Sequence, residues 1–152
     1  MREKVKDAAR ELGLELTVTT LEQSTKTVGD AAAAVGCDEA MIAKSIVFVC
    51  DGDPIVCVTS GAHRVDVERV ALARDCAEAR MATPEEVRAA TGYPVGGVPP
   101  FGHGLPVLFD ETLLHQERIW AAGGDSNSLF EVDPRALIEC VSAEVVPLGT
   151  SA

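Results

Sequence analysis

The feature that most constrains the fold is a pair of apolar segments joined by one short turn. Residues 43–50 read AKSIVFVC, a run that predicts a strand buried on both faces. The next four residues, DGDP at 51–54, are typical of a tight turn, and a second apolar segment covers residues 55–59. The sequence therefore predicts a β-hairpin, with Lys44 close to the start of its first strand.

The remaining segments mix helices and strands without a regular βαβ repeat. Asp66 and Thr83 are predicted N-caps, and Pro84 follows Thr83 at a first helical position. We expect helices at 5–12, 30–35, 67–74, 84–91 and 134–140, a helical turn at 111–115, and further strands at 14–20, 105–109, 119–122, 129–132 and 144–148. This pattern predicts one α/β domain over residues 1–152, with a mixed, curved, barrel-like sheet flanked by helices.

The charge balance excludes one class of function. The chain has 13 Lys and Arg against 24 Asp and Glu, a net charge of −11, whereas a general nucleic-acid binder carries a positive surface. A local basic cluster is compatible with this balance and would draw on Arg64, Arg69, Arg74, Arg80 and Arg88. The first residues are charged, and no apolar run approaches a membrane span. We expect a cytoplasmic protein that binds neither DNA nor membranes.

Metal, cofactor and nucleophile motifs are missing from the sequence. The five cysteines form no CxxC pair, which favours reduced thiols, and the three histidines share no metal-ligand spacing. No serine lies in a GxSxG setting, and Gly123-Gly124 is not a dinucleotide fingerprint. We therefore expect no metal and no cofactor.

Two features remain as candidate chemistry. Lys44 is unusual in an apolar strand; it either extends its ammonium to water or holds a substrate oxygen as a fixed cation. The stretch GGVPPFGH at 96–103 combines glycines of free φ with two prolines of fixed φ. It is either a stiff turn or a backbone shaped to present the amides of Gly96, Gly97 and Val98. His103 closes this loop and either braces it or contacts a substrate.

Three blocks of sequence resemble one known family. They are IAKSIVF around Lys44, TGYPVGGVPPFGH at 91–103 and AAGG at 121–124. Together they are similar to the YbaK/prolyl-tRNA-synthetase-associated editing domains, over residues from about Leu21 to Cys140. The resemblance implies a trans-editing enzyme that hydrolyses the ester of a mischarged aminoacyl-tRNA without a metal. Water would attack the ester carbonyl, with a ribose hydroxyl of the tRNA as a candidate helper.

The resemblance also implies roles for individual residues. Lys44 would anchor the terminal adenosine or the substrate carbonyl, and the backbone of Gly96, Gly97 and Val98 would line the ester. The implied substrate contacts are Ser24, Thr25, Thr27, Ser45, Pro99, Pro100, His103, Gly123, Gly124, Asp125 and Ser126.

The implied substrate is less defined than the implied reaction. Residues 22–27 resemble a subgroup that acts on small or hydroxylated residues, so alanyl, seryl, threonyl and cysteinyl esters are the candidates. Better-known deacylases of the family carry an aspartate where counting places Leu129. Asp125, Ser126 or Ser128 would have to substitute for it, or the amino-acid pocket differs.

Two other classes of function stay open. One is a non-catalytic module that binds tRNA or a synthetase, and the other is an esterase that acts on a small metabolite. Because the chain is acidic, we expect it to read only the acceptor end of the tRNA, or to rely on a partner aminoacyl-tRNA synthetase for the tRNA body.

Overall fold

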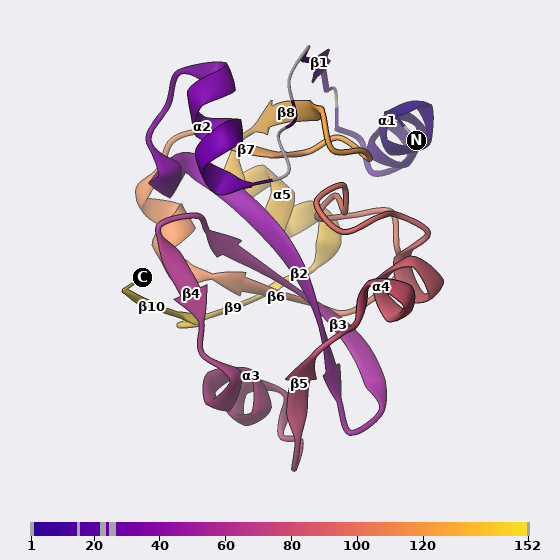
Figure 1. Ribbon diagram of the computed structural model, residues 1–152, viewed down its shortest axis with the longest axis vertical. Helices are drawn as coiled ribbons and strands as arrows, with labels where there is room; N and C mark the ends of the chain where they lie inside the picture. Colours follow the sequence, from indigo (N-terminus) through magenta and orange to yellow (C-terminus); the bar gives the residue numbers. More distant parts are fainter. Residues whose placement is uncertain (1, 15, 22–23, 25–26, 152) are drawn as a thin grey trace.

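The predicted hairpin forms the middle of the fold. The structure, a computed structural model, describes residues 2–14, 16–21, 24 and 27–151. Strand β2 (Ile42–Cys50) pairs antiparallel with β3 (Asp53–Ser60) along its length. Asp51 and Gly52 between them have φ values of 48° and 88°, as a two-residue turn of the primed type requires. Figure 1 shows this hairpin running through the centre of the molecule.

The hairpin belongs to a mixed sheet, which confirms the predicted fold class. The strand order is β1-β8-β7-β2-β3-β6-β9, and β5 pairs with the edge of β2. Pairings β2–β7, β3–β6 and β6–β9 are parallel, and the others are antiparallel. The other strands of this sheet are β1 (Val18–Thr20), β5 (Ala79–Met81), β6 (Val107–Asp110), β7 (Ile119–Ala122), β8 (Ser128–Val132) and β9 (Glu144–Val146). A separate small sheet joins β4 (His63–Val65) to β10 (Gly149–Ser151).

Two of the helices begin at the polar caps that the sequence predicts. The helices are α1 (Arg2–Glu11), α2 (Val28–Val35), α3 (Val67–Arg74), α4 (Pro84–Thr91) and α5 (Pro134–Val141), with 3-10 turns at Glu39–Met41 and Glu111–His115. The predicted caps Asp66 and Thr83 are confirmed, and Thr83 forms a full capping box with Glu86. Helix α2 begins two residues earlier than expected because Thr27 is its cap.

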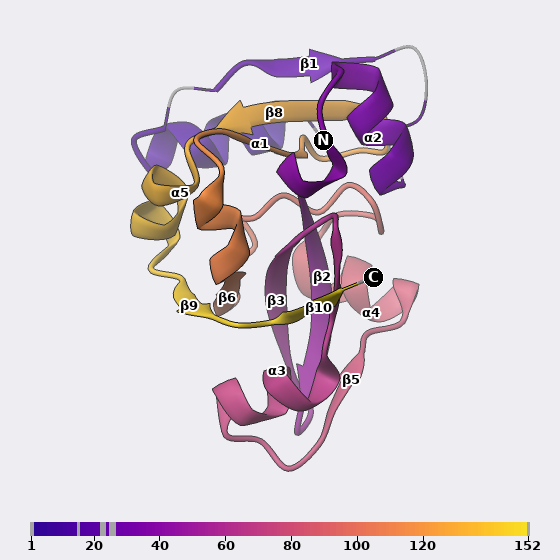
Figure 2. The same cartoon turned by 90° about the vertical axis from the view of Figure 1, so that its left-hand side faces the viewer.

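The core lies on both faces of the hairpin. Alternate residues of β2 enter different clusters: Ala43 and Val47 join the larger cluster, and Phe48 and Cys50 join a second one. A third cluster, which contains Ile42, packs below α2. Figure 2 shows α2 with β1 and β8 at one end of the molecule and α3 at the other. None of the described helices is long and apolar enough to cross a membrane.

Candidate functional site

A gap in the strand pairing along β2 creates the candidate site. On the side of β2 away from β3, β7 pairs with Ile42 and Ala43, and β5 pairs with residues 48–50. Between these two partners, residues 44–47 have no strand beside them within the described part of the sheet. A strand edge that lies open between two paired segments leaves backbone groups available to a ligand.

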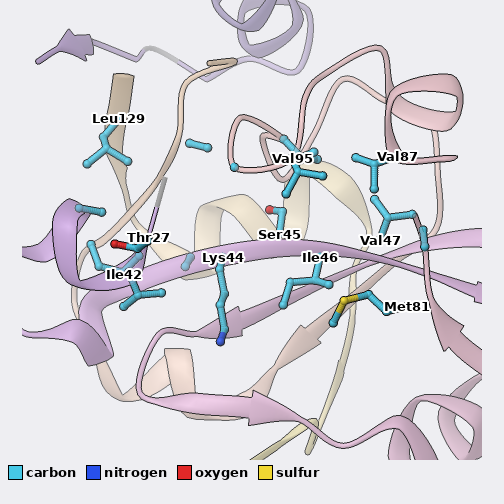
Figure 3. Close-up of a pocket in the computed structure, with 17 residues that line it drawn as sticks. Thr27, Ile42, Lys44, Ser45, Ile46, Val47, Met81, Val87, Val95 and Leu129 are labelled. Carbon is cyan, nitrogen blue, oxygen red and sulfur yellow. The ribbon is translucent and has the colours of Figure 1, made fainter. Parts of the chain in front are cut away.

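A pocket of about 350 Å³ lies along this open edge. It lies between α2, the hairpin, the start of α4, the loop after α4, and the ends of β7 and β8 (Figure 3). Its lining residues are Thr27, Val28, Ala31, Ile42, Ala43, Lys44, Ser45, Ile46, Val47, Met81, Ala82, Val87, Val95, Gly96, Val98, Ala122 and Leu129. The pocket therefore includes Thr27, Lys44, Ser45, Gly96 and Val98 from the predicted site.

Ser45 turns its backbone toward the pocket. The carbonyl of Val47 accepts from the amide of Ala82 on the open side of β2, and the carbonyl of Ile42 accepts from Gly61 on the other side. Because backbone groups alternate along a strand, Ser45 points the same way as Val47. The Oγ atom of Ser45 is also buried and has no hydrogen-bond partner among the described residues. Buried hydroxyls are nearly always bonded, so this atom points to a ligand or water in the pocket.

Lys44 faces the other side of the same strand. Its side chain leaves β2 on the face opposite Ser45, as Figure 3 shows. Burial lowers the pKa of the Lys44 ammonium, and the positive charge of Arg64 lowers it further. Lys44 is among the residues that line the pocket, and its side chain lies on the same face of the sheet as that of its register partner Thr59. The side chains of Lys44 and Ser45, the two polar residues of the gap, thus lie on opposite faces of β2.

The loop at 96–100 packs tightly against the Gly-Gly turn. Gly96 has a φ of 84°, which favours glycine, and Gly97 lies so close to the turn that a Cβ atom there would be 2.9 Å from Cα of Asp125. The amide of Gly97 donates to the carbonyl of Pro94 at 2.9 Å, so this amide closes the loop's own turn. Pro99 and Pro100, the last residues of the loop, are buried and do not line the pocket.

His103 lies away from this pocket. It borders a second cavity of about 480 Å³ between α1, α5 and the residues before β6. Its Nδ1 accepts from the amide of Leu105 at 3.1 Å. Burial lowers the pKa of His103 to about 4, so its ring is neutral at pH 7. Of the two roles left open by the sequence, the structure favours bracing the loop.

The polar residues after the Gly-Gly pair bind one another. Asp125 accepts from the hydroxyl of Ser128 at 2.7 Å and from the amide of Asn127 at 3.1 Å. Ser24 donates to the carbonyl of Ser126 at 3.3 Å, which ties this turn to the segment before α2. None of these residues lines the pocket, and neither do Gly123 and Gly124. Thr25, the remaining predicted contact, lies outside the described residues.

Most of the apolar wall of the pocket could not be predicted from the sequence. Val28, Ala31, Met81, Val87 and Val95 are ordinary apolar residues in helices, a short strand and a loop. Periodicity shows which of them are buried but not which face a cavity. Leu129 is the exception, because it occupies the position at which the family resemblance implies an aspartate. Within the described chain, no group of His, Cys, Asp and Glu is arranged to hold a metal ion.

Comparisons with known proteins show which family this chain is similar to. A family model described as an aminoacyl-tRNA editing domain matches residues 22–140. The uncharacterized protein YwhH of Bacillus subtilis is 36% identical over 128 residues, which cover 82% of this chain and 81% of YwhH. A proline–tRNA ligase of Nitratidesulfovibrio vulgaris is 31% identical over 100 residues, which cover 65% of this chain but only 17% of the ligase. A crystal structure of a candidate trans-editing enzyme for prolyl tRNA synthetase superposes with a TM-score of 0.92 and 38% identity, covering 99% of this chain and 97% of that one.

Proposed function

Because the chain belongs to the aminoacyl-tRNA editing domain family, we propose that it hydrolyses the ester of a mischarged aminoacyl-tRNA. The observation that carries the proposal is the pocket on the open edge of β2, where Ser45 offers a backbone amide, a carbonyl and an unbonded hydroxyl. The similarity to a proline–tRNA ligase and to a candidate trans-editing enzyme for prolyl tRNA synthetase supports tRNA for proline as the tRNA of the substrate.

The hydrolysis of the ester requires few protein groups. Water adds to the ester carbonyl carbon, the bond from that carbon to the ribose oxygen breaks, and a proton passes to that oxygen. The products are a free amino acid and a tRNA with its terminal hydroxyl restored. A neighbouring ribose hydroxyl is suited to pass the proton. The protein supplies orientation and hydrogen-bond donors for the developing oxyanion.

The two sides of β2 divide these tasks. The backbone and hydroxyl of Ser45 face the pocket, where they can bond the ester carbonyl or the α-ammonium group. The ammonium of Lys44, on the other face and beside the exposed Arg64, suits a phosphate or ribose oxygen of the terminal nucleotide. Lys44 would then anchor the nucleotide while Ser45 orients the ester.

The charge of the whole chain limits how tRNA is held. With a net charge of −11, long-range attraction for the tRNA body is weak. We therefore propose that the protein reads the acceptor end alone, or with a synthetase that holds the rest. A dissociation constant in the nanomolar range for tRNA alone at physiological salt would contradict this.

The test compares two lysine variants. Purified wild type, Lys44→Ala and Lys6→Ala are incubated with alanyl-tRNA for proline, and the released alanine is measured. Lys6 is a matched control because it lies on α1 and pairs only with Glu3, at 3.7 Å, among the ion pairs of the described residues. We expect Lys44→Ala to lose about 100-fold in rate and Lys6→Ala to keep the wild-type rate. Equal rates for all three proteins would refute the role of Lys44, and binding without release would indicate a non-catalytic module.

A further inference from the structure

We infer that this pocket selects aliphatic aminoacyl groups over hydroxylated ones, an inference that rests on the proposed function and names its substrate class. The sequence left alanyl, seryl, threonyl and cysteinyl esters equally open. The lining of the pocket separates them.

The pocket has a closed end and an open end. At the end that we call closed, Ala31, Ile42 and Leu129 are only 2%, 4% and 3% exposed, whereas Thr27 beside them is exposed. At the other end, Met81 and Val95 are 61% and 45% exposed. An aminoacyl side chain is the terminal part of the substrate, whereas the nucleotide continues into the tRNA and must reach solvent. The side chain therefore belongs at the closed end, and the nucleotide leaves past Met81 and Val95.

Among the described residues, the side chains at the closed end are almost entirely hydrocarbon. Ala31, Ile42 and Leu129 belong to one apolar cluster, and Val28 packs against it. Thr27 is the polar side chain of this end, beside Ile42 (Figure 3). Its Oγ1 already accepts from the amide of Asp30 at 3.1 Å as the cap of α2. Ser45 lies on the Val95 side of the pocket, where the ester is proposed to bind.

Asp125, which the sequence analysis named as a substitute for the family aspartate, lies outside the described lining of the pocket. Asp125 accepts from Ser128 and Asn127 within its own turn, outside the pocket lining. Leu129, at the position where the family aspartate was counted, places an alkyl group at the closed end instead. No carboxylate or amide side chain is among the described residues that line the pocket. Among the described residues at this end, a substrate hydroxyl finds only the Thr27 hydroxyl as a side-chain donor, which disfavours its insertion.

The magnitude follows from isosteric pairs. Valine and threonine have the same shape and differ by a methyl group in place of a hydroxyl. An apolar pocket discriminates such a pair by roughly 10- to 100-fold. We expect kcat/KM for the valyl ester to exceed that for the threonyl ester by this factor, and alanyl to exceed seryl in the same direction.

The experiment measures both esters on the same tRNA with wild type, Leu129→Asn and Leu129→Met. Asn is close in size to Leu and brings a donor and an acceptor, whereas Met keeps the volume and the apolar character. We expect Leu129→Asn to reduce the valyl-to-threonyl ratio about tenfold and Leu129→Met to leave it unchanged. Should Leu129→Asn fail to fold, the wild-type ratio decides alone. A wild-type ratio of one or less overturns the inference.

A binding measurement separates this inference from the proposed reaction. The valyl and threonyl amides of 3′-amino-3′-deoxyadenosine cannot be hydrolysed as esters, and their affinities are measured by calorimetry with wild type and both variants. Tighter binding of the valyl amide without hydrolysis of any ester would uphold the selectivity and reject deacylation. Equal or tighter binding of the threonyl amide would reject the selectivity even if the esters are hydrolysed.

Discussion

Replacing Gly97 by alanine should impair hydrolysis far more than folding. A Cβ atom at Gly97 would lie 2.9 Å from Cα of Asp125, and 3.0 Å from both the amide nitrogen of Asp125 and the carbonyl carbon of Gly124. All three are backbone atoms, which cannot rotate away as a side chain does. Since carbon atoms pack at about 3.5–4.0 Å, the two loops must separate by roughly 0.5–1 Å.

The size of both effects follows from that displacement. Overpacking of this kind costs about 1–3 kcal/mol, and each kcal/mol lowers the Tm of a chain this long by about 2–4 °C. The pocket is lined by Gly96 and Val98 from one loop and by Ala122, which lies next to the other loop. The pocket walls therefore move when the loops separate. A misplacement of about 1 Å at a reacting centre can reduce the rate about 100-fold.

Gly104→Ala is the matched control. Gly104 lies a few residues further along the same segment, with a φ of 73° and no atom within 4 Å of a Cβ built there. Alanine in this conformation costs about 1–2 kcal/mol without moving the pocket. Thermal unfolding and the deacylation rate are measured for both variants. We expect similar losses of Tm and a rate loss specific to Gly97→Ala. If Gly97→Ala retains the wild-type rate, or loses no more than Gly104→Ala, the two loops do not shape the reacting site.

Two further predictions concern polar side chains. Ser45→Ala removes a buried hydroxyl that has no hydrogen-bond partner among the described residues, so we expect an unchanged or higher Tm together with roughly tenfold lower kcat/KM. A lower Tm with unchanged kcat/KM would show a purely structural role. His103 has a folded pKa of about 4, below the unfolded value of about 6.5. The contribution of the neutral His103 ring to the free energy of unfolding is therefore fully present above pH 6.5. It is lost as the pH falls toward 4, and the loss is about 3 kcal/mol at most. The difference in unfolding free energy between wild type and His103→Asn should follow this pH window, and a difference that does not vary with pH would contradict the assignment.

Many of the helices and strands could be predicted from local features of the sequence. The caps at Asp66 and Thr83 act through neighbouring backbone amides, and the turn at 51–52 depends on local φ preferences, so a single segment of sequence contains the information. The three-residue strands β4, β5 and β10 were not predicted, because three residues are too few for a periodic pattern. Their formation depends on partners that lie far along the chain.

The candidate site was less predictable for a related reason. Lys44 and Ser45 are adjacent in sequence, yet strand alternation directs them to opposite faces of β2, and the importance of Ser45 depends on the gap between β7 and β5. That gap results from the lengths of two strands that pair with β2 from distant parts of the chain. Residue type alone also could not show that Asp125 bonds within its own turn while Leu129 faces the pocket.

The most direct test of the central claim is the number of turnovers on a mischarged tRNA. The tRNA for proline, charged with alanine or valine, is mixed with wild-type protein at a far lower concentration. The free amino acid released is then measured over time. If the protein is a deacylase, many amino acids are released per protein molecule, and Lys44→Ala loses that release. Release of no more than one amino acid per protein molecule, or a rate unaffected by Lys44→Ala, would contradict it.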